Sequence, residues 1–273
     1  MCVSIIAKHL GFNLIILILS GIAIAYITYP LATILTFIQP SKMIDSLTRS
    51  QVWDAFILSL FSATVSTLLL SLFGIPLAYF LARYSNFPGK FVLRLVIIIP
   101  LVLPPLASGA LLLGVFGGHN SLLVKTFPGV EFTQSTVGVI IAQTYVASPF
   151  MILASQVGFE SVDESYEKVA RVLGKTRLQT FFKISLPLAK TGIAIGFIMS
   201  WVRAVGELGA TMMMAYNPHT ISIQIFEDNA IGGLRQAVPD MILVILLSIL
   251  VIIAFHITRK RGHDVLKILG GKQ

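Results

Sequence analysis

The sequence is poor in charge and almost free of cysteine. Aspartate, glutamate, lysine and arginine make up 12% of its 273 residues, against about a quarter in an average soluble domain. The single cysteine, Cys2, excludes an internal disulfide. Hydrophobic residues reach 56%, more than a soluble domain usually carries. The composition therefore predicts an integral membrane protein.

The motifs of several enzyme classes are missing as well. The chain has no His-Glu-x-x-His or Gly-x-Ser-x-Gly stretch, and its histidines are isolated at or beyond the ends of apolar runs. The absence of these motifs argues against a metalloprotease or a serine hydrolase. Residues 173–176 end like a phosphate-binding loop, but Val169 stands where that loop needs its first glycine. We therefore expect no catalytic residue, no metal site and no bound cofactor in this chain.

Six apolar runs are long enough to cross a bilayer, which takes about 20 residues as a helix. The predicted spans cover residues 14–38, 54–82, 92–115, 136–157, 192–216 and 239–257. The first run resembles a signal peptide at its start, but it continues past the roughly 7–15 apolar residues of a cleaved segment. We predict an all-α integral membrane protein that forms one domain over residues 1–273.

Lysine and arginine alternate between the two sides of these spans. Fifteen lie before the first span, between the second and third, between the fourth and fifth, and after the sixth. The other connections hold only Lys42, Arg49, Lys125 and Arg235. Because positive charge gathers on the cytoplasmic side, we expect both termini in the cytoplasm. The net charge of +8 is then a topology signal and predicts no nucleic-acid partner.

The connection over residues 161–187, on the positive side, is basic and amphipathic. Ser161 and Glu164 have the spacing of a capping box. Apolar residues follow at helical spacing, with Glu167 off this stripe: Val162, Tyr166, Val169, Ala170 and Leu173. Gly174 suits the left-handed residue that ends a helix, and a second short helix is predicted from Thr176. Pro187 suits the first turn of the next span.

Two roles for residues 161–187 remain open at this point. A basic amphipathic helix can lie among lipid headgroups. An apolar stripe beside a glycine turn also suits a docking element for a cytoplasmic partner, and we favour this second interpretation.

The fifth predicted span carries a charged pair. Arg203 lies well inside it, where an arginine costs about 2.5–3.5 kcal/mol, and Glu207 follows four residues later on the same helical face. The pair either favours an anion in a pathway or locks the helix as a structural ion pair. Pro104, Pro105 and Ser108 in the third span predict a kinked helix with a face of small residues. This face either packs against a neighbouring helix or lines a pathway. Gly192-xxx-Gly196 and Gly114-xxx-Gly118 match a helix-contact pattern.

Gly174 and the later Ile184-x-Leu186-Pro187 resemble the cytoplasmic signature of ABC importer permeases, which is Glu-Ala-Ala, three residues, Gly, nine residues and Ile-x-Leu-Pro. Lys168-Val169-Ala170 occupies the Glu-Ala-Ala positions, so only the last alanine is kept, and Glu167 lies one residue early. The resemblance implies a coupling loop that inserts into a separate ATP-hydrolysing subunit. The coupling residues it implies are Glu167, Ala170, Leu173, Gly174, Ile184, Leu186 and Pro187.

A second resemblance concerns the substrate. Residues 203–211, Arg-Ala-x-Gly-Glu-x-Gly-Ala-Thr, resemble the fifth-span motif of the permeases that import molybdate, tungstate or sulfate. Residues 100–105 and 142–150 resemble the third and fourth spans of the molybdate/tungstate members. The pathway residues implied are Arg203, Glu207, Thr211, Pro104, Pro105 and Ser108. A sulfate or thiosulfate ABC permease and a secondary anion carrier remain as alternatives.

The same resemblance implies several partners in a prokaryotic cell membrane. A second permease copy would be related by a two-fold axis, and two ATPase subunits would use ATP on the cytoplasmic side. An extracellular or periplasmic binding protein would dock on the outer loops, which are predicted at residues 117–135 and 217–237.

Overall fold

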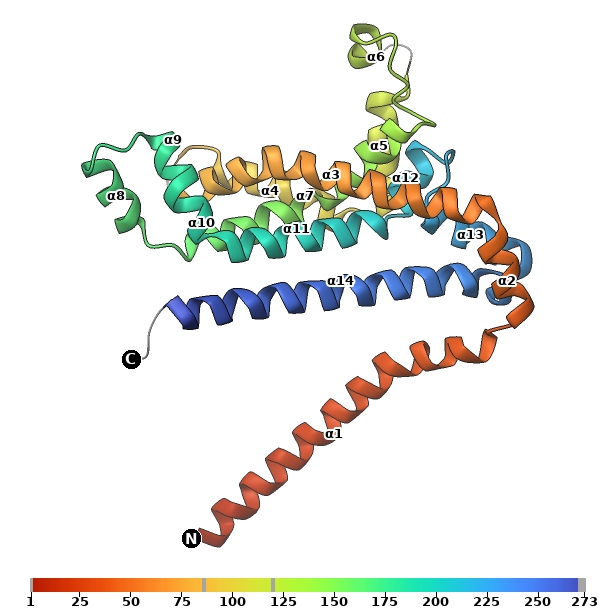
Figure 1. Ribbon diagram of the computed structural model, residues 1–273, viewed down its shortest axis with the longest axis horizontal. Helices are drawn as coiled ribbons and strands as arrows, with labels where there is room; N and C mark the ends of the chain where they lie inside the picture. Colours follow the sequence, from red (N-terminus) through yellow and green to blue (C-terminus); the bar gives the residue numbers. More distant parts are fainter. Residues whose placement is uncertain (1, 85–86, 119–120, 270–273) are drawn as a thin grey trace.

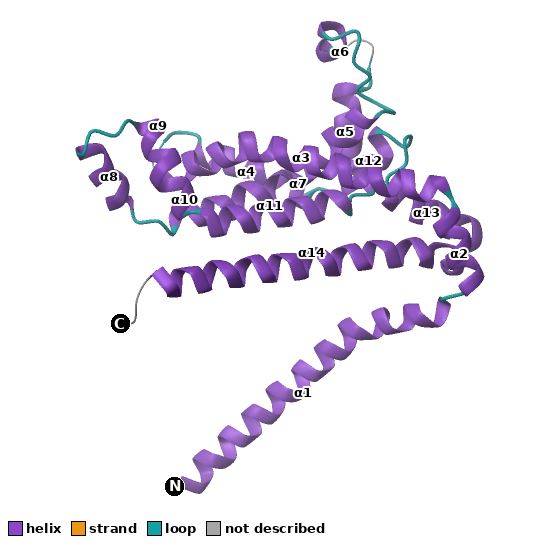
Figure 2. Ribbon diagram, viewed as in Figure 1, coloured by secondary structure: helices purple, strands orange, loops and turns teal. Residues whose placement is uncertain are grey.

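The computed structural model describes residues 2–84, 87–118 and 121–269, so His119 and Lys272 lie outside the described residues. Every regular element in these ranges is helical, as the sequence predicts (Figure 2). The helices are α1 (Cys2–Ile34), α2 (Pro40–Thr48), α3 (Ser50–Arg83), α4 (Lys90–Val102), α5 (Pro105–Phe116), α6 (Leu122–Thr126), α7 (Thr136–Glu160), α8 (Glu164–Val172), α9 (Arg177–Thr180), α10 (Leu186–Leu188), α11 (Lys190–Val205), α12 (Gly209–Met214), α13 (Ile221–Gly232) and α14 (Leu234–Leu269). A 3₁₀ turn (Leu35–Phe37) follows α1, and a π-helical turn (Phe181–Ser185) joins α9 to α10.

Four stretches are long and apolar enough to cross a membrane as single helices: Asn13–Phe37, Ser50–Arg83, Thr136–Glu160 and Leu234–Val251. Two bent helix pairs pass the same test of length and apolarity only when each pair is taken together. One joins Lys90–Val102 to Pro105–Phe116 at 115°, and the other joins Arg177–Leu188 to Lys190–Val205 at 75°. The protein is therefore a multi-pass helical membrane protein with four to six spans.

The third predicted span, residues 92–115, is broken rather than kinked. Leu103 and Pro104 both adopt extended backbone, with ψ of 138° and 137°. A residue that precedes proline is disfavoured in the helical region, and Leu103 and Pro104 each precede one. Two consecutive prolines therefore separate α4 from α5.

The centre of the bundle is formed by α3, α7 and α11, which lie side by side (Figure 1). Gly158 of α7 and Gly192 of α11 face each other so closely that a Cβ on Gly192 would lie 2.4 Å from the Cα of Gly158. Gly196 also abuts α7, at the carbonyl of Met151. The contact predicted for Gly192 and Gly196 is confirmed, whereas a Cβ on Gly114 of the second glycine pair would have no neighbour within 4 Å among the described residues.

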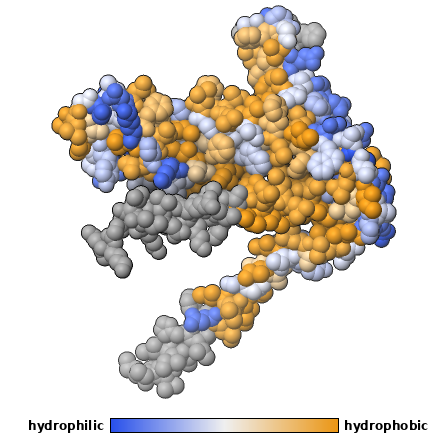
Figure 3. Space-filling model, viewed as in Figure 1, coloured by the Kyte–Doolittle hydropathy of each residue, from blue (hydrophilic) through white to orange (hydrophobic). Residues whose placement is uncertain are grey.

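The two ends of this bundle have different contents. Helices α8, α9 and α10 lie at one end, and α2, α12 and α13 lie at the other (Figure 1). Hydrophobic residues cover the body between them, while hydrophilic residues gather toward both ends (Figure 3). Helix α1 stands apart, and none of its apolar window is buried. The apolar surface between the ends is suited to contact with lipid hydrocarbon.

The end of the bundle opposite α8 holds a polar cluster that ties α2 and α3 to α13 and α14. The guanidinium of Arg49 donates two hydrogen bonds to the carboxylate of Asp228, at 3.1 and 2.9 Å. The Ser46 hydroxyl donates to Oδ1 of Asp240 at 2.5 Å. This part of the structure corrects the prediction that residues 217–237 form an outer loop, because residues 221–232 form α13 and bury Ile221 and Ile223 completely.

Candidate functional site

The segment between α7 and α11 begins with a helix cap on Asp163. Its Oδ1 accepts a hydrogen bond from the backbone N–H of Ser165 at 2.8 Å, and this bond lowers the pKa of the Asp163 carboxyl. The capping box predicted for Ser161 is therefore wrong. The Ser161 hydroxyl instead donates to the carbonyl of Gly158 at 2.7 Å, at the end of α7. An aspartate cap leaves the start of α8 negatively charged, which suits the helix dipole.

Helix α8 ends at Val172, and Gly174, two residues later, has a φ of 82° and is left-handed as predicted. The N–H of Gly174 donates to the carbonyl of Arg171, and the N–H of Lys175 donates to that of Ala170, each at 3.0 Å. These two bonds form a Schellman motif, which satisfies the last carbonyls of a helix through a left-handed residue. Gly174 therefore sets the turn between α8 and α9.

The next short helix, α9, begins with a reciprocal cap. Thr176 accepts the N–H of Gln179, and the Gln179 side chain accepts the N–H of Thr176, each at 3.2 Å. The π-helical turn then brings the N–H of Leu186 to the carbonyl of Phe181. Pro187 follows without an N–H, and a proline in a regular helix would clash with the carbonyl four residues earlier. The widened turn relieves that conflict just before the bend into α11.

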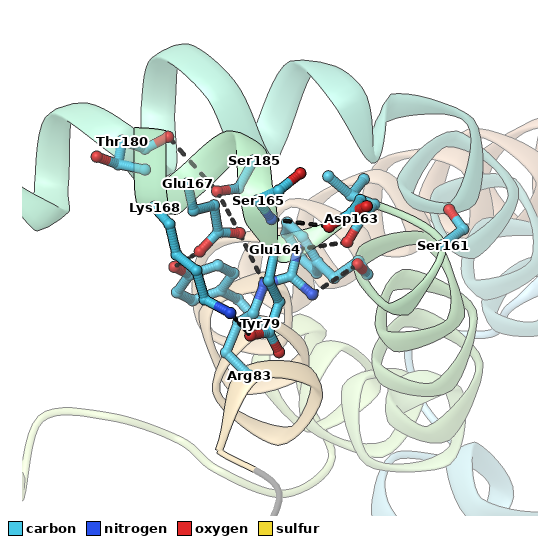
Figure 4. A network of polar contacts seen from close by, with 12 residues as sticks. Tyr79, Arg83, Ser161, Asp163, Glu164, Ser165, Glu167, Lys168, Thr180 and Ser185 are labelled. Atoms are coloured by element: carbon cyan, nitrogen blue, oxygen red, sulfur yellow. Dashed lines mark hydrogen bonds and ion pairs between the residues drawn. The ribbon is translucent and has the colours of Figure 1, made fainter. Parts of the chain in front are cut away.

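A buried carboxylate joins this segment to the bundle (Figure 4). The side chain of Glu167 accepts hydrogen bonds from Nε of Arg83 at 2.7 Å, from the Tyr79 hydroxyl at 2.9 Å and from the Ser185 hydroxyl at 2.8 Å. Burial alone would raise the pKa of Glu167. The hydrogen bonds from Arg83, Ser185 and Tyr79 lower it by more, so the net effect is a lowered pKa. Glu167 remains ionised and connects α8 to α3 and to the π-helical turn.

Arg83, the last residue of α3, also holds the end of α7. Its guanidinium donates to the carbonyls of Phe159 and Val162, at 2.9 and 3.1 Å. Helical periodicity places Glu167 off the apolar stripe, and no partner was predicted for its carboxylate. Tyr79, Arg83 and Ser185 were not predicted, because helical periodicity does not indicate contacts between separate segments, here 88, 84 and 18 positions from Glu167.

The predicted apolar stripe of α8 is divided between two environments. Val162 and Ala170 are buried. Tyr166, Val169 and Leu173 are 59%, 58% and 75% exposed, although large apolar side chains are usually buried. Helix α8 thus presents an open apolar face while its other side is fixed to the bundle through Glu167. In the second half of the segment, Ile184 and Leu186 are half-buried and Pro187 is exposed.

The second group of predicted residues lies where the fifth span breaks. The sequence analysis predicts one helix over residues 192–216, but α11 ends at Val205 and α12 begins at Gly209. Arg203 and Glu207 nevertheless form an ion pair. Oε1 of Glu207 also accepts the N–H of Ala210 at 2.7 Å. Glu207 therefore caps α12, a role that depends on the break.

The two members of this pair differ in exposure. The Glu207 side chain is 1% exposed, whereas that of Arg203 is 28% exposed. Thr211 is completely buried, and its hydroxyl donates to the carbonyls of Glu207 and Leu208. The arginine thus keeps part of its charge accessible, while the residues that hold it are enclosed.

The broken third and fifth spans meet. Helix α5 packs on α12, where a Cβ on Gly109 would lie 2.8 Å from the Cα of Ala210 and one on Gly209 would lie 2.7 Å from Cβ of Pro105. Pro104 and Pro105 are exposed. Ser108 is completely buried, and its hydroxyl has no hydrogen-bond partner among the described residues. The structure thus brings the α5 and α12 residues together, at the end of α11 opposite the α8 group (Figure 1).

A multi-pass helical protein with broken spans and a loop fixed beneath them has the architecture of a transporter membrane subunit. Two solved structures share the fold. The bacterial alginate ABC transporter in complex with its alginate pentasaccharide-bound periplasmic protein matches with a TM-score of 0.69 at 17% identity, over 91% of this chain and 94% of that one. The MetNI methionine ABC transporter matches with a TM-score of 0.57 at 14% identity, over 78% and 99%.

The chain belongs to the family of binding-protein-dependent transport system inner membrane components, whose model matches residues 74–261. A probable molybdenum ABC transporter permease protein of Haloferax volcanii is 37% identical over 88% of each chain. The molybdate/tungstate transport system permease protein WtpB of Thermococcus kodakarensis is 38% identical over 88% of this chain and 93% of that one. The resemblance predicted from residues 168–211 is confirmed.

Proposed function

We propose that this chain is the permease subunit of an ABC importer that moves molybdate or tungstate into the cell. The family and the named functions of its relatives support this assignment. The observation that carries it is the form of the segment between α7 and α11, which is fixed to the bundle by Glu167 and exposes apolar Tyr166, Val169 and Leu173. A partner protein that covers this face can move the bundle.

In the proposed mechanism, an ATPase subunit receives this exposed face of α8. Glu167 and Ala170 keep α8 attached to the bundle, and Gly174 directs the chain back into α9. Ile184 and Leu186 connect the π-helical turn to the buried residues beneath it, and Pro187 precedes the 75° bend into α11. Leu173 contributes apolar surface to the docking face. Closure of the ATPase is thereby transmitted to α11.

Arg203 is the proposed anion-attracting group of the pathway. Molybdate and tungstate are dianions, and a partly exposed guanidinium at membrane depth attracts such charge. Glu207 holds the guanidinium in place and fixes the start of α12. Pro104 and Pro105 open the third span beside this break, and Ser108 and Thr211 support the two short helices from behind.

The complete importer in this proposal has several chains. A second permease copy lies across a two-fold axis, and two ATPase subunits hydrolyse ATP in the cytoplasm. An extracellular or periplasmic binding protein delivers the oxyanion to the end of the bundle opposite α8. This chain itself binds no ATP and no other cofactor, and it holds both termini in the cytoplasm. Outer residues 117–135 and the surface of α13 are the proposed contact for the binding protein.

Substrate-stimulated ATP hydrolysis in liposomes tests this function. The chain is reconstituted with its ATPase and binding protein, and tungstate, molybdate and sulfate are added separately. We expect stimulation by tungstate and molybdate and none by sulfate. Stimulation by sulfate would retain the ABC mechanism and overturn the substrate. Uptake driven by an ion gradient without any ATPase would overturn the proposed class in favour of a secondary carrier.

A further inference from the structure

A cleft of about 280 Å³ opens between α8, α9 and the end of α3. Since a water molecule occupies roughly 30 Å³ in the liquid, the cleft has room for a small hydrated ion or a lipid headgroup. Four basic side chains line it: Arg83, Lys168, Arg171 and Arg177. Its acidic lining consists of Glu164 and Glu167, so the lining carries more positive than negative charge.

The two acids already have basic partners. Glu167 pairs with Arg83 at 2.7 Å, and Glu164 pairs with Lys168 at 3.4 Å. Arg171 and Arg177 have no hydrogen-bonded or ion-paired side-chain partner among the described residues. The cleft therefore has two guanidinium groups available for an anion. Guanidinium binds phosphate oxygens in a planar, bidentate geometry.

The position of the cleft suggests where its ligand comes from. Arg83 ends a candidate membrane span, and Lys90 begins another, so the cleft lies near the level at which spans leave the hydrocarbon. Tyr84 lines the cleft and stacks on Phe80, with ring centroids 4.8 Å apart. Tyrosine is common at the depth of lipid headgroups, and basic pockets on the cytoplasmic side bind anionic ones.

The cleft lies on a different side of α8 from the proposed ATPase face. Its lining residues on this helix occur at positions 164, 167, 168 and 171, whereas the exposed apolar residues are at 166, 169 and 173. At 3.6 residues per turn these two sets point in roughly opposite directions. A partner that covers Tyr166, Val169 and Leu173 therefore leaves this side of α8 to another ligand.

We propose that this cleft binds a phosphate group through Arg171 and Arg177. The group belongs either to an anionic phospholipid or to free phosphate, and both offer the same tetrahedral oxyanion. Binding places negative charge between α8 and α9 and steadies the coupling segment at the membrane surface. The inference uses the proposed orientation of the chain but does not depend on the transported substrate.

The test uses the full chain in nanodiscs and compares two variants that each remove two positive charges. Arg171→Gln/Arg177→Gln removes the cleft arginines, and Lys175→Gln/Lys183→Gln removes two exposed cations that do not line the cleft. One arm measures by native mass spectrometry how much phosphatidylglycerol stays bound in discs of mainly phosphatidylcholine. The other arm titrates inorganic phosphate in pure phosphatidylcholine discs and follows thermal stability.

We expect roughly tenfold weaker binding in the arginine variant and little change in the lysine variant. Retention of phosphatidylglycerol alone would identify a lipid headgroup, and a phosphate-dependent shift alone would identify free phosphate. Equal losses in both variants, or no binding of either probe to the unaltered chain, would overturn the proposal. So would weaker ATPase pull-down by the arginine variant without probe binding. Failure of the ATPase to bind any form would instead count against the proposed function.

Discussion

The strongest single test of the coupling segment is Glu167→Gln. This change keeps the size of the side chain and one carbonyl acceptor, but it removes the negative charge that Arg83, Tyr79 and Ser185 share. Arg83 then remains buried and retains only the carbonyls of Phe159 and Val162 as acceptors beside the amide. We expect α8 to open from the bundle more often, while the helices of the membrane stay folded.

The magnitude follows from the kind of bonds lost. Hydrogen bonds to a charged group contribute about 1.5–3 kcal/mol, and both the Glu167 and Arg83 side chains are more than nine-tenths buried, so solvent screens them little. Since about 1.4 kcal/mol is a tenfold change in an equilibrium, amide hydrogen exchange over residues 164–185 should become roughly 10- to 100-fold faster. The assay is exchange followed by mass spectrometry, with purified protein in a bilayer.

Glu164→Gln is the matched control, because it removes the same charge from the same helix. Within the described part of the chain Glu164 pairs only with Lys168, at 3.4 Å, and both side chains are more than half exposed. Such surface pairs contribute about 0–1 kcal/mol, so exchange should change little. Equal acceleration in both variants, or none in Glu167→Gln, would refute the role of Glu167 as the anchor.

Three further predictions concern the same path. Because the pKa of Glu167 is lowered from 4.5 in the folded chain, its stabilisation is present above about pH 4.5 and is lost as the pH falls through the lowered value. The protection factors of the segment's amides, which divide out the intrinsic pH dependence of exchange, should therefore fall in that acidic range, and a fall above pH 6 would contradict this. Gly174→Asp should reduce ATPase pull-down strongly while leaving membrane insertion intact. The reason is that a side chain at a φ of 82° costs about 1–2 kcal/mol of conformational free energy. Normal pull-down would count against docking at this turn. Arg203→Met should lower oxyanion uptake more than it lowers recovery of the assembled complex, and equal losses would support a purely structural ion pair.

Much of the membrane architecture could be predicted from the sequence, because an apolar run of about 20 residues has few alternatives to a spanning helix. The predicted span at 136–157 corresponds to Thr136–Glu160, and that at 54–82 corresponds to Ser50–Arg83. The turn at Gly174 could be predicted for a local reason, since few residues other than glycine adopt a positive φ at low cost.

The breaks and the anchor could not be predicted in the same way. Glycine is common in unbroken membrane helices, so Gly206 and Gly209 did not indicate that α11 ends at Val205. The role of Glu167 depends on Arg83, which lies 84 residues earlier. Helical periodicity describes one helix at a time, and it therefore could not distinguish a buried, paired carboxylate from a solvated one.

The same limit explains why the helix α13 (Ile221–Gly232) was not predicted within residues 217–237. Residues 217–237 are polar enough to suit a loop, but Arg49 and Ser46 supply partners for Asp228 and Asp240 from far away in the sequence. The backbone N–H of Ile221 also donates to the Ser59 hydroxyl at 2.8 Å, and Ile221 and Ile223 are completely buried. A polar stretch that would be a loop in isolation is therefore stable as the helix α13.

The contact between Gly158 and Gly192 bears on how the proposed coupling would move α11. The backbones of α7 and α11 approach so closely there that neither glycine has room for a side chain, which makes this contact the natural pivot for a tilt of α11. Arg203 lies 11 residues beyond Gly192, or about 16 Å along the helix at 1.5 Å per residue. A tilt of about 10° at the pivot would then displace Arg203 by about 3 Å. A displacement of that size is comparable to one hydrogen-bond length, so a tilt of α11 would change the distance between the Arg203 guanidinium and an anion in the proposed pathway.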